Sequence, residues 1–150
     1  MSADEPKAAD PNTDDPGSAA VSADDHRTAV STDRAPTPTG PFSQAIRTGN
    51  LVFTAGQAGR NRDTGQMGDL AEQTSWALDN LDNILRAAGT ELANVVKATI
   101  FIKDGTDTSG LNEVWSARFA EPRPARSSVF VSRLKNPEML VEIEVVAVVR

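Results

Sequence analysis

Two carboxylates near the end of the chain are its most unusual chemical feature. Glu142 and Glu144 interrupt the apolar run 140–149, whose pattern predicts a strand. Alternate residues of a strand share a face and lie ~6.6 Å apart, so both glutamates share a face with Val146 and Val148. Two interpretations stay open. The pair flanks an interface or binds basic residues, or one carboxylate sits in a partly desolvated cleft and orients or deprotonates water.

Arg126 is the second candidate. It stands at the start of the strand predicted over residues 125–131, and Ser128 and Phe130 share its face. A planar guanidinium in such a place suits a carboxylate, whether of a substrate or of a neighbouring glutamate. The residue pattern alone is compatible with a ligand clamp and equally with a structural ion pair.

Missing residue types exclude many other chemistries. The chain has no cysteine and no tyrosine, and its single histidine, His26, lies in an acidic N-terminal segment. Thiol nucleophiles, thiolate metal sites and Ser-His-Asp triads are therefore excluded from the folded part. Lys97 and Lys103 lack the apolar surroundings of a Schiff-base lysine. Catalysis must rest on carboxylates, arginine, hydroxyls and backbone dipoles.

Charge and composition divide the chain into two parts. Residues 1–38 hold eight acids and three bases, so five of the six net negative charges lie there. Residues 1–35 are poor in bulky apolar side chains and are predicted to be a disordered acidic extension. Residues 36–150 form the single predicted domain. This near-neutral domain predicts no nucleic-acid or membrane partner, and the absence of a signal or spanning segment predicts a cytoplasmic protein.

The apolar spacing predicts the elements that carry the candidates. Strands are expected over 42–47 and 51–54 around a Thr48-Gly49-Asn50 turn, then over 95–103, 125–131 and 140–149. A helix is expected from the cap Asp69 to the C-terminal Gly89, and a second one after a cap at Thr108 or Ser109. Trp76 and Trp115 fall at helical positions and are expected in the core. The order ββαβαββ defines an α+β domain with a mixed sheet.

Both faces of the last predicted strand are largely apolar, with the odd-numbered residues 141–149 on one face. The two predicted helices cover roughly one face of such a sheet. A second copy of the chain is the simplest cover for the other face, which predicts a homo-oligomer.

Several short motifs occur in order along residues 36–150 and together resemble the reactive-intermediate (enamine/imine) deaminase family, also called RidA or YjgF-like. They are Gly40-Pro41-Phe42-Ser43-Gln44-Ala45, Ala55-Gly56-Gln57, Leu78-Asp79-Asn80, residues 96–104, Asn112, Pro124-Ala125-Arg126-Ser127 and Glu142-Ile143-Glu144.

The resemblance implies a chorismate-mutase-like fold assembled as a homotrimer, with the sheets lining a central barrel and pockets between subunits. It implies hydrolysis of 2-imino acids or their enamine tautomers to 2-oxo acids and ammonia, without metal or organic cofactor. Arg126 would then bind the substrate carboxylate and Glu142 would position the attacking water. Gly56 and Ser128 would contribute polar groups to the pocket. Arg126 and Glu142 would meet in a crevice shared by two chains.

Two positions depart from the family pattern. Phe42 stands where a tyrosine is usual, and Ala55 stands where a serine is usual. Two hydroxyls are thus missing from the implied pocket, which becomes more apolar. The alternatives are a specialised biosynthetic member with an altered pocket, or a non-catalytic trimer that binds small carboxylates or acts as a chaperone. A ribonuclease is disfavoured by the charge of the domain.

Overall fold

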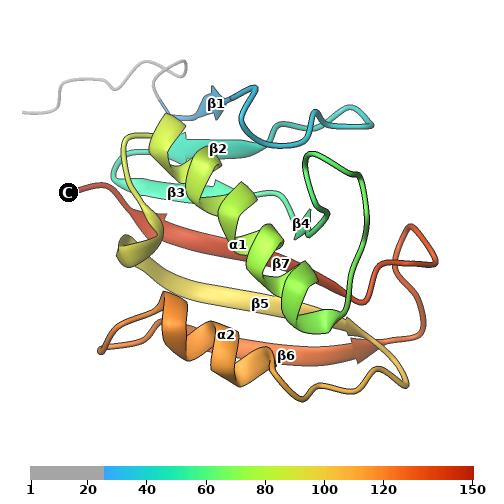
Figure 1. Ribbon diagram of the computed structural model, residues 1–150. Coiled ribbons are helices and arrows are strands. Elements are labelled where there is room, and N and C mark those ends of the chain that lie inside the picture. Colours follow the sequence, from blue (N-terminus) through green and yellow to red (C-terminus); the bar gives the residue numbers. More distant parts are fainter. Residues whose placement is uncertain (1–25) are drawn as a thin grey trace, which may run out of the picture.

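A computed structural model of the chain describes residues 26–150 and shows a seven-stranded mixed sheet with two helices on one face (Figure 1). Residues 1–25, most of the predicted extension, lie outside the described residues. The elements are β1 (Thr28–Val30), β2 (Ala45–Thr48), β3 (Leu51–Thr54), β4 (Gln57–Ala58), α1 (Leu70–Ala87), the 3-10 turn η1 (Leu92–Asn94), β5 (Val95–Lys103), α2 (Leu111–Arg118), β6 (Ala125–Val131) and β7 (Val141–Val148).

The strand order is β1-β2-β3-β7-β5-β6, and β4 adds a short pairing with β7. Strands β5 and β6 run parallel and the other pairs are antiparallel, which confirms the α+β class and the mixed sheet. The first predicted hairpin is also confirmed, because Gly49, at φ 56°, and Asn50 connect β2 to β3. A positive φ at this position suits glycine. Strand β6 forms one edge of the sheet.

Helix α1 begins and ends as the sequence predicts. The Asp69 carboxylate accepts a hydrogen bond from the Glu72 N–H at 2.9 Å, and the Glu72 carboxylate accepts one from the Asp69 N–H, also at 2.9 Å. This reciprocal arrangement satisfies two N–H groups that the helix leaves without partners. At the other end Gly89, at φ 87°, lets the Thr90 N–H reach the Leu85 carbonyl at 3.0 Å.

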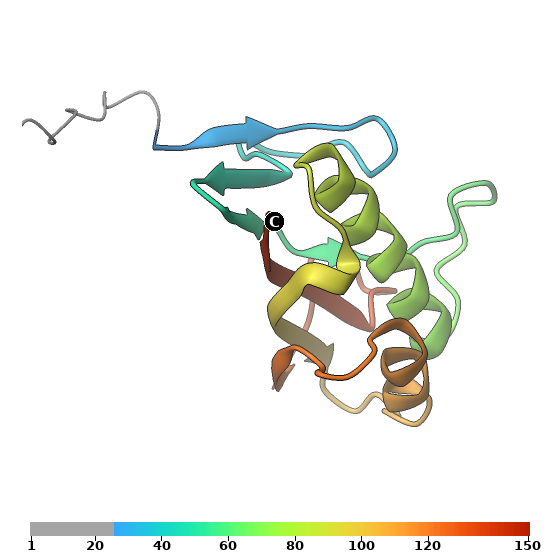
Figure 2. The same ribbon diagram turned by 90° about the vertical axis from the view of Figure 1, so that its left-hand side faces the viewer.

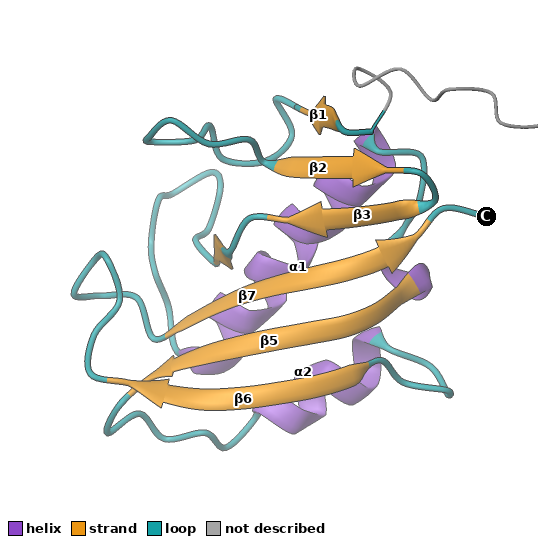
Figure 3. Cartoon of the chain, turned by 180° about the vertical axis from the view of Figure 1, so that it is seen from behind, coloured by secondary structure: helices purple, strands orange, loops and turns teal. Residues whose placement is uncertain are grey.

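The core lies between the sheet and the two helices. The odd-numbered residues of β7 face the helices, and Ile143 is fully buried there with Leu78, Leu81, Ile84 and Ile100. The opposite side, which we call the bare face, carries the even-numbered residues of β7 and is covered by no helix of the described chain (Figures 2 and 3). The predicted alternation along β7 is therefore confirmed. That a second copy of the chain covers the bare face stays a prediction.

The predicted boundary at residue 36 is too late. Strand β1 pairs with β2, and Val30 and Ala35 are buried at 8% and 6% exposure. The buried Gln44 side chain holds this segment, because its amide accepts from the Thr32 N–H at 2.7 Å and donates to the Thr32 and Pro36 carbonyls at 3.1 and 2.9 Å. Tertiary hydrogen bonding thus orders a stretch whose composition alone favours disorder.

Two local predictions are wrong. Residues 57–58, which lie outside the predicted strands, form β4 because Gln57 pairs with Ile143 of β7, a long-range pairing that local propensity does not show. Helix α2 is capped by Gly110, at φ 84°, rather than by Thr108 or Ser109. The Ser109 N–H instead bonds the Asp107 side chain at 2.9 Å, so a turn precedes the helix.

Neither helix in residues 26–150 is long and apolar enough to cross a membrane.

Candidate functional site

A cavity of about 510 Å³ lies beside the N-terminal end of β7, where β4 pairs with it. Three segments surround it: the chain before β2, the loop around β4, and the loop between β6 and β7. Its lining residues are Pro36, Thr37, Pro38, Thr39, Phe42, Gln44, Gly56, Gln57, Ala58, Gly59, Arg60, Met67, Lys135, Met139 and Glu142. The volume is typical of a small-molecule site.

Glu142 is the acid in the lining of this cavity. It is half-buried on β7, opposite Phe101 of β5 and Ala58 of β4. Burial raises the pKa of the Glu142 carboxyl above its ordinary value, the charge of Glu144 raises it further, and Lys135 partly offsets the rise. The carboxylate packs so closely on Gly56 that a methyl group there would overlap it. A desolvated carboxylate of this kind is a stronger base than an exposed one.

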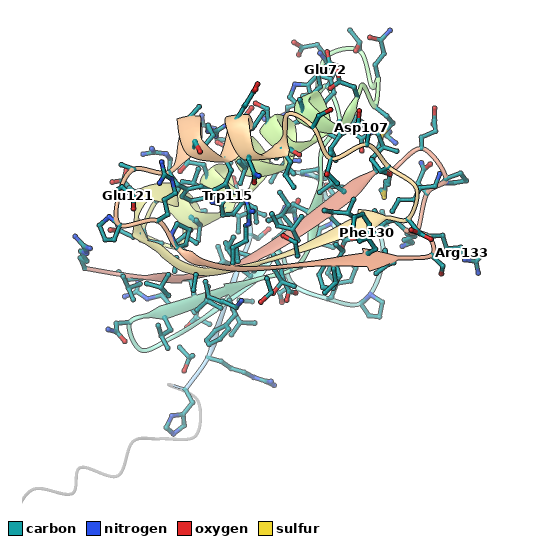
Figure 4. The ribbon with its side chains drawn as sticks, turned by 90° about the horizontal axis from the view of Figure 1, so that it is seen from below. Glu72, Asp107, Trp115, Glu121, Phe130 and Arg133 are labelled. Atoms are coloured by element: carbon teal, nitrogen blue, oxygen red, sulfur yellow. The ribbon has the colours of Figure 1, made fainter. Side chains whose placement is uncertain are left out.

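Arg126 is held from two sides by α2. Its guanidinium donates to Asn112 Oδ1 at 2.9 Å and lies 5.1 Å from the centroid of the Trp115 ring. Trp115 is 4% exposed and lies between α2 and the sheet (Figure 4). The stack and the hydrogen bond fix the plane of the guanidinium. No carboxylate of the described residues forms an ion pair with Arg126, so its remaining N–H groups are available to a ligand.

Within one protomer the structure does not bring Arg126 and Glu142 together. Arg126 pairs in register with Ala98, whose side chain faces the helices, whereas Glu142 pairs with Phe101 on the bare face. Strand β5 lies between β6 and β7, so these two strands are ~10 Å apart, and the side chains of Arg126 and Glu142 point to opposite faces of the sheet. Ser128 shares the face of Arg126.

The predicted site residues therefore fall into two groups. Phe42 and Gly56 line the cavity with Glu142, while Arg126 and Ser128 lie on the exposed edge strand β6. Ala55 lies next to Gly56 but is not part of the cavity lining; its N–H donates to the Gln44 carbonyl at 2.8 Å. It therefore shapes the loop rather than the cavity wall.

Sequence reasoning missed the two partners of Arg126. Asn112 and Trp115 are three residues apart, which places them on one face of α2. That spacing indicates that the two side chains can contact the same group, whereas the helical pattern predicts Trp115 only in the core. Trp115 is in the core, as predicted, and also contacts Arg126.

The two glutamates have different surroundings. Glu144 lines a shallower hollow on the bare face with Lys97 and Phe53. Lys97 donates to the Ser127 hydroxyl at 2.7 Å, which gives this lysine a structural partner. Of the two carboxylates, only Glu142 borders the larger cavity, which favours the cleft interpretation for Glu142. The interface interpretation of Glu144 stays a prediction.

Comparison with known proteins identifies the family to which this fold belongs. The family model described as endoribonuclease L-PSP matches residues 32–149. A RutC family protein of Pyrococcus abyssi is 45% identical over 120 residues, covering 79% of this chain and 94% of its own length. The 2-iminobutanoate/2-iminopropanoate deaminase of Escherichia coli K12 is 39% identical over 125 residues, covering 81% and 97%. The chain belongs to the RidA/YjgF family.

A solved structure supports the same assignment. Escherichia coli TdcF, crystallised with bound serine, is 35% identical to this chain and superposes with a TM-score of 0.72. The similarity covers 81% of this chain and 98% of TdcF.

Proposed function

We propose that the protein hydrolyses 2-imino acids, or their enamine tautomers, to 2-oxo acids and ammonia. The observation that carries the proposal is the half-buried Glu142 carboxylate, with its raised pKa, at the wall of a ligand-sized cavity. Arg126, oriented by Asn112 and Trp115, is the complementary group for the substrate carboxylate.

The complete site would form between two protomers. Arg126 and Glu142 face opposite sides of one sheet, so a small imino acid would not contact both within one chain. In a closed ring, here a homotrimer, the β6 edge of one protomer would supply Arg126 to the Glu142 cavity of the next. The uncovered bare face gives such a ring an apolar surface to bury.

The chemistry needs few groups. Water adds to the iminium carbon while Glu142 takes a proton from it, and the carboxylate also stabilises the positive charge of the iminium. The protonated Glu142 then gives its proton to the nitrogen of the tetrahedral adduct and becomes a carboxylate again. As the carbon–nitrogen bond breaks, Glu142 accepts the hydroxyl proton, the carbon–oxygen double bond of the 2-oxo acid forms, and ammonia leaves; the proton then passes to ammonia, which departs as ammonium. Arg126 fixes the carboxylate end, so that the imine carbon and the water meet in one orientation.

The relatives support this choice of chemistry. The Escherichia coli relative is named as an imine deaminase, and TdcF holds serine, an amino acid with the carboxylate that Arg126 would bind. The endoribonuclease in the family description is a weaker proposal for this chain. Residues 39–150 carry thirteen acids and twelve bases, so they offer no basic surface to a polyanion.

Replacing Arg126 tests the proposal. Arg126→Ala is expected to lower kcat/KM for the imine of alanine or leucine by about 100-fold, because the substrate loses its charged anchor. The assay follows 2-oxo acid release from imines produced in situ. Arg133→Ala, at an exposed arginine near the end of β6 (Figure 4), is the matched control and should retain normal activity. Equal activity of wild type and Arg126→Ala contradicts the proposal, and ligand binding without turnover in the wild type selects a non-catalytic carboxylate-binding protein.

Two glycines three residues apart give a second prediction. A methyl group on Gly56 would meet the movable Glu142 side chain, whereas one on Gly59 would meet the backbone carbonyl of Gln73. Gly56→Ala is therefore expected to lower kcat/KM by ~10-fold or more with little change in stability. Gly59→Ala is expected to lower the free energy of unfolding by about 1–3 kcal/mol or more. Thermal melts and the imine assay on both variants check this; equal loss of stability in the two would contradict it.

A further inference from the structure

The wall of the cavity around Glu142 is predominantly apolar. Pro36, Pro38, Phe42, Met67 and Met139 contribute to it. The Phe42 ring is 52% exposed, so it is open to contact by a ligand. The ring lies beside Gly40, whose carbonyl accepts a hydrogen bond from the Phe42 N–H at 2.9 Å. A ligand side chain entering the cavity therefore meets a largely apolar surface.

Two polar groups of the same wall have partners within the protein. The Gln44 amide is used in three hydrogen bonds with Thr32 and Pro36. Lys135 donates to the Thr39 hydroxyl at 2.9 Å. A pocket that discriminates by hydrogen bonding needs polar groups that remain unsatisfied without the right ligand. The Gln44 amide does not have that property, and Lys135 already uses one of its three N–H donors.

The size of the cavity points in the same direction. At about 510 Å³ it exceeds what the methyl or ethyl side chain of a small imino acid would fill. Poorly filled apolar space contributes little to binding, whereas each additional buried methylene group favours the complex. Phe42, the residue that lacks the hydroxyl usual in the family pattern, forms part of this space.

We infer that the substrates are 2-imino acids with large apolar side chains, of the branched aliphatic, thioether or aromatic classes. This inference rests on the proposed function and deepens it. The carboxylate would lie on Arg126, the imine carbon beside Glu142, and the side chain against Phe42, Met67 and Met139.

The test compares imines with one another in the same enzyme. An L-amino acid oxidase with catalase generates the imines of alanine, leucine, methionine, phenylalanine and glutamate, and the release of 2-oxo acid gives kcat/KM for each. We expect the leucine, methionine or phenylalanine imine to exceed the alanine imine by at least ~10-fold. Phe42→Tyr should reduce this ratio, since its hydroxyl would be buried against an apolar side chain. Phe53→Tyr, at an exposed phenylalanine outside the cavity, should leave the ratio unchanged.

The outcomes separate the inference from the function on which it rests. Acceleration of no imine overturns both. An alanine imine hydrolysed as well as the larger ones overturns the inference and leaves the deaminase proposal standing. A preference for the glutamate imine also overturns it, because Arg60 and Lys135 in the cavity lining would then be binding a second carboxylate.

Discussion

Glu142→Gln is expected to lower kcat/KM for imine hydrolysis by about 10²–10⁴-fold, because the amide can neither accept a proton from water nor return one to the leaving nitrogen. The substitution preserves size and shape at a position where Gly56 packs directly on the side chain. The wild-type rate should fall as pH is lowered through the raised pKa of Glu142, at a higher pH than for an ordinary glutamate. The small residual rate of the variant should lack this dependence.

The same substitution should also stabilise the fold at neutral pH. Because burial and Glu144 raise the pKa of Glu142, the folded protein binds this proton more tightly than the unfolded chain. The favourable contribution is present at low pH and is lost as pH rises through the folded-state pKa. Glu142→Gln removes this loss. The expected gain in the free energy of unfolding at neutral pH is at most about 1 kcal/mol, because a half-buried carboxylate keeps part of its hydration. Thermal melts from pH 4 to pH 8 should show that the melting temperature of the variant, relative to that of the wild type, increases as pH rises. The opposite trend would contradict the burial argument.

Mixing two inactive variants is expected to restore activity. If Arg126 and Glu142 of different protomers complete each site, Arg126→Ala and Glu142→Gln protomers complement each other. In a closed ring of randomly mixed protomers, about one quarter of the interfaces join an intact Arg126 to an intact Glu142. Co-expressed mixtures should therefore recover roughly one quarter of wild-type kcat, a large gain over either variant alone.

The control uses the double variant. Mixtures of Arg126→Ala/Glu142→Gln with either single variant contain no intact pair and should stay inactive. If the two single variants remain inactive after mixing, and light scattering shows that mixed oligomers formed, the shared site is wrong and each residue acts in a separate environment.

Much of the fold could be predicted because its signals are local. Asp69 and Gly89 mark the ends of α1, and the alternation along β7 separates its two faces. Strands β1 and β4 could not be predicted, since they are short and polar in part and exist through pairing with β2 and β7. In such segments the distant partner, rather than the local sequence, decides the structure.

The candidate site was predictable residue by residue but not in its arrangement. Alternation shows which residues of one strand share a face, and it says nothing about how β6 is aligned with β5. That register, Arg126 with Ala98, places Arg126 on the side of the helices. A shift of one residue would have placed it on the side of Glu142. The proposal that two protomers complete the site thus depends on a single alignment between strands.

The buried amide of Gln44 limits where the chain can be shortened. A form beginning at residue 26 keeps every hydrogen bond that ties this side chain to Thr32 and Pro36. A form beginning at residue 36 deletes strand β1 and the Thr32 partners, and leaves part of a 3%-exposed amide without protein acceptors or donors. Water would have to enter that space, next to a wall of the Glu142 cavity. Engineered versions with a trimmed N-terminus should therefore keep residues 26–35, although their composition resembles that of a dispensable leader.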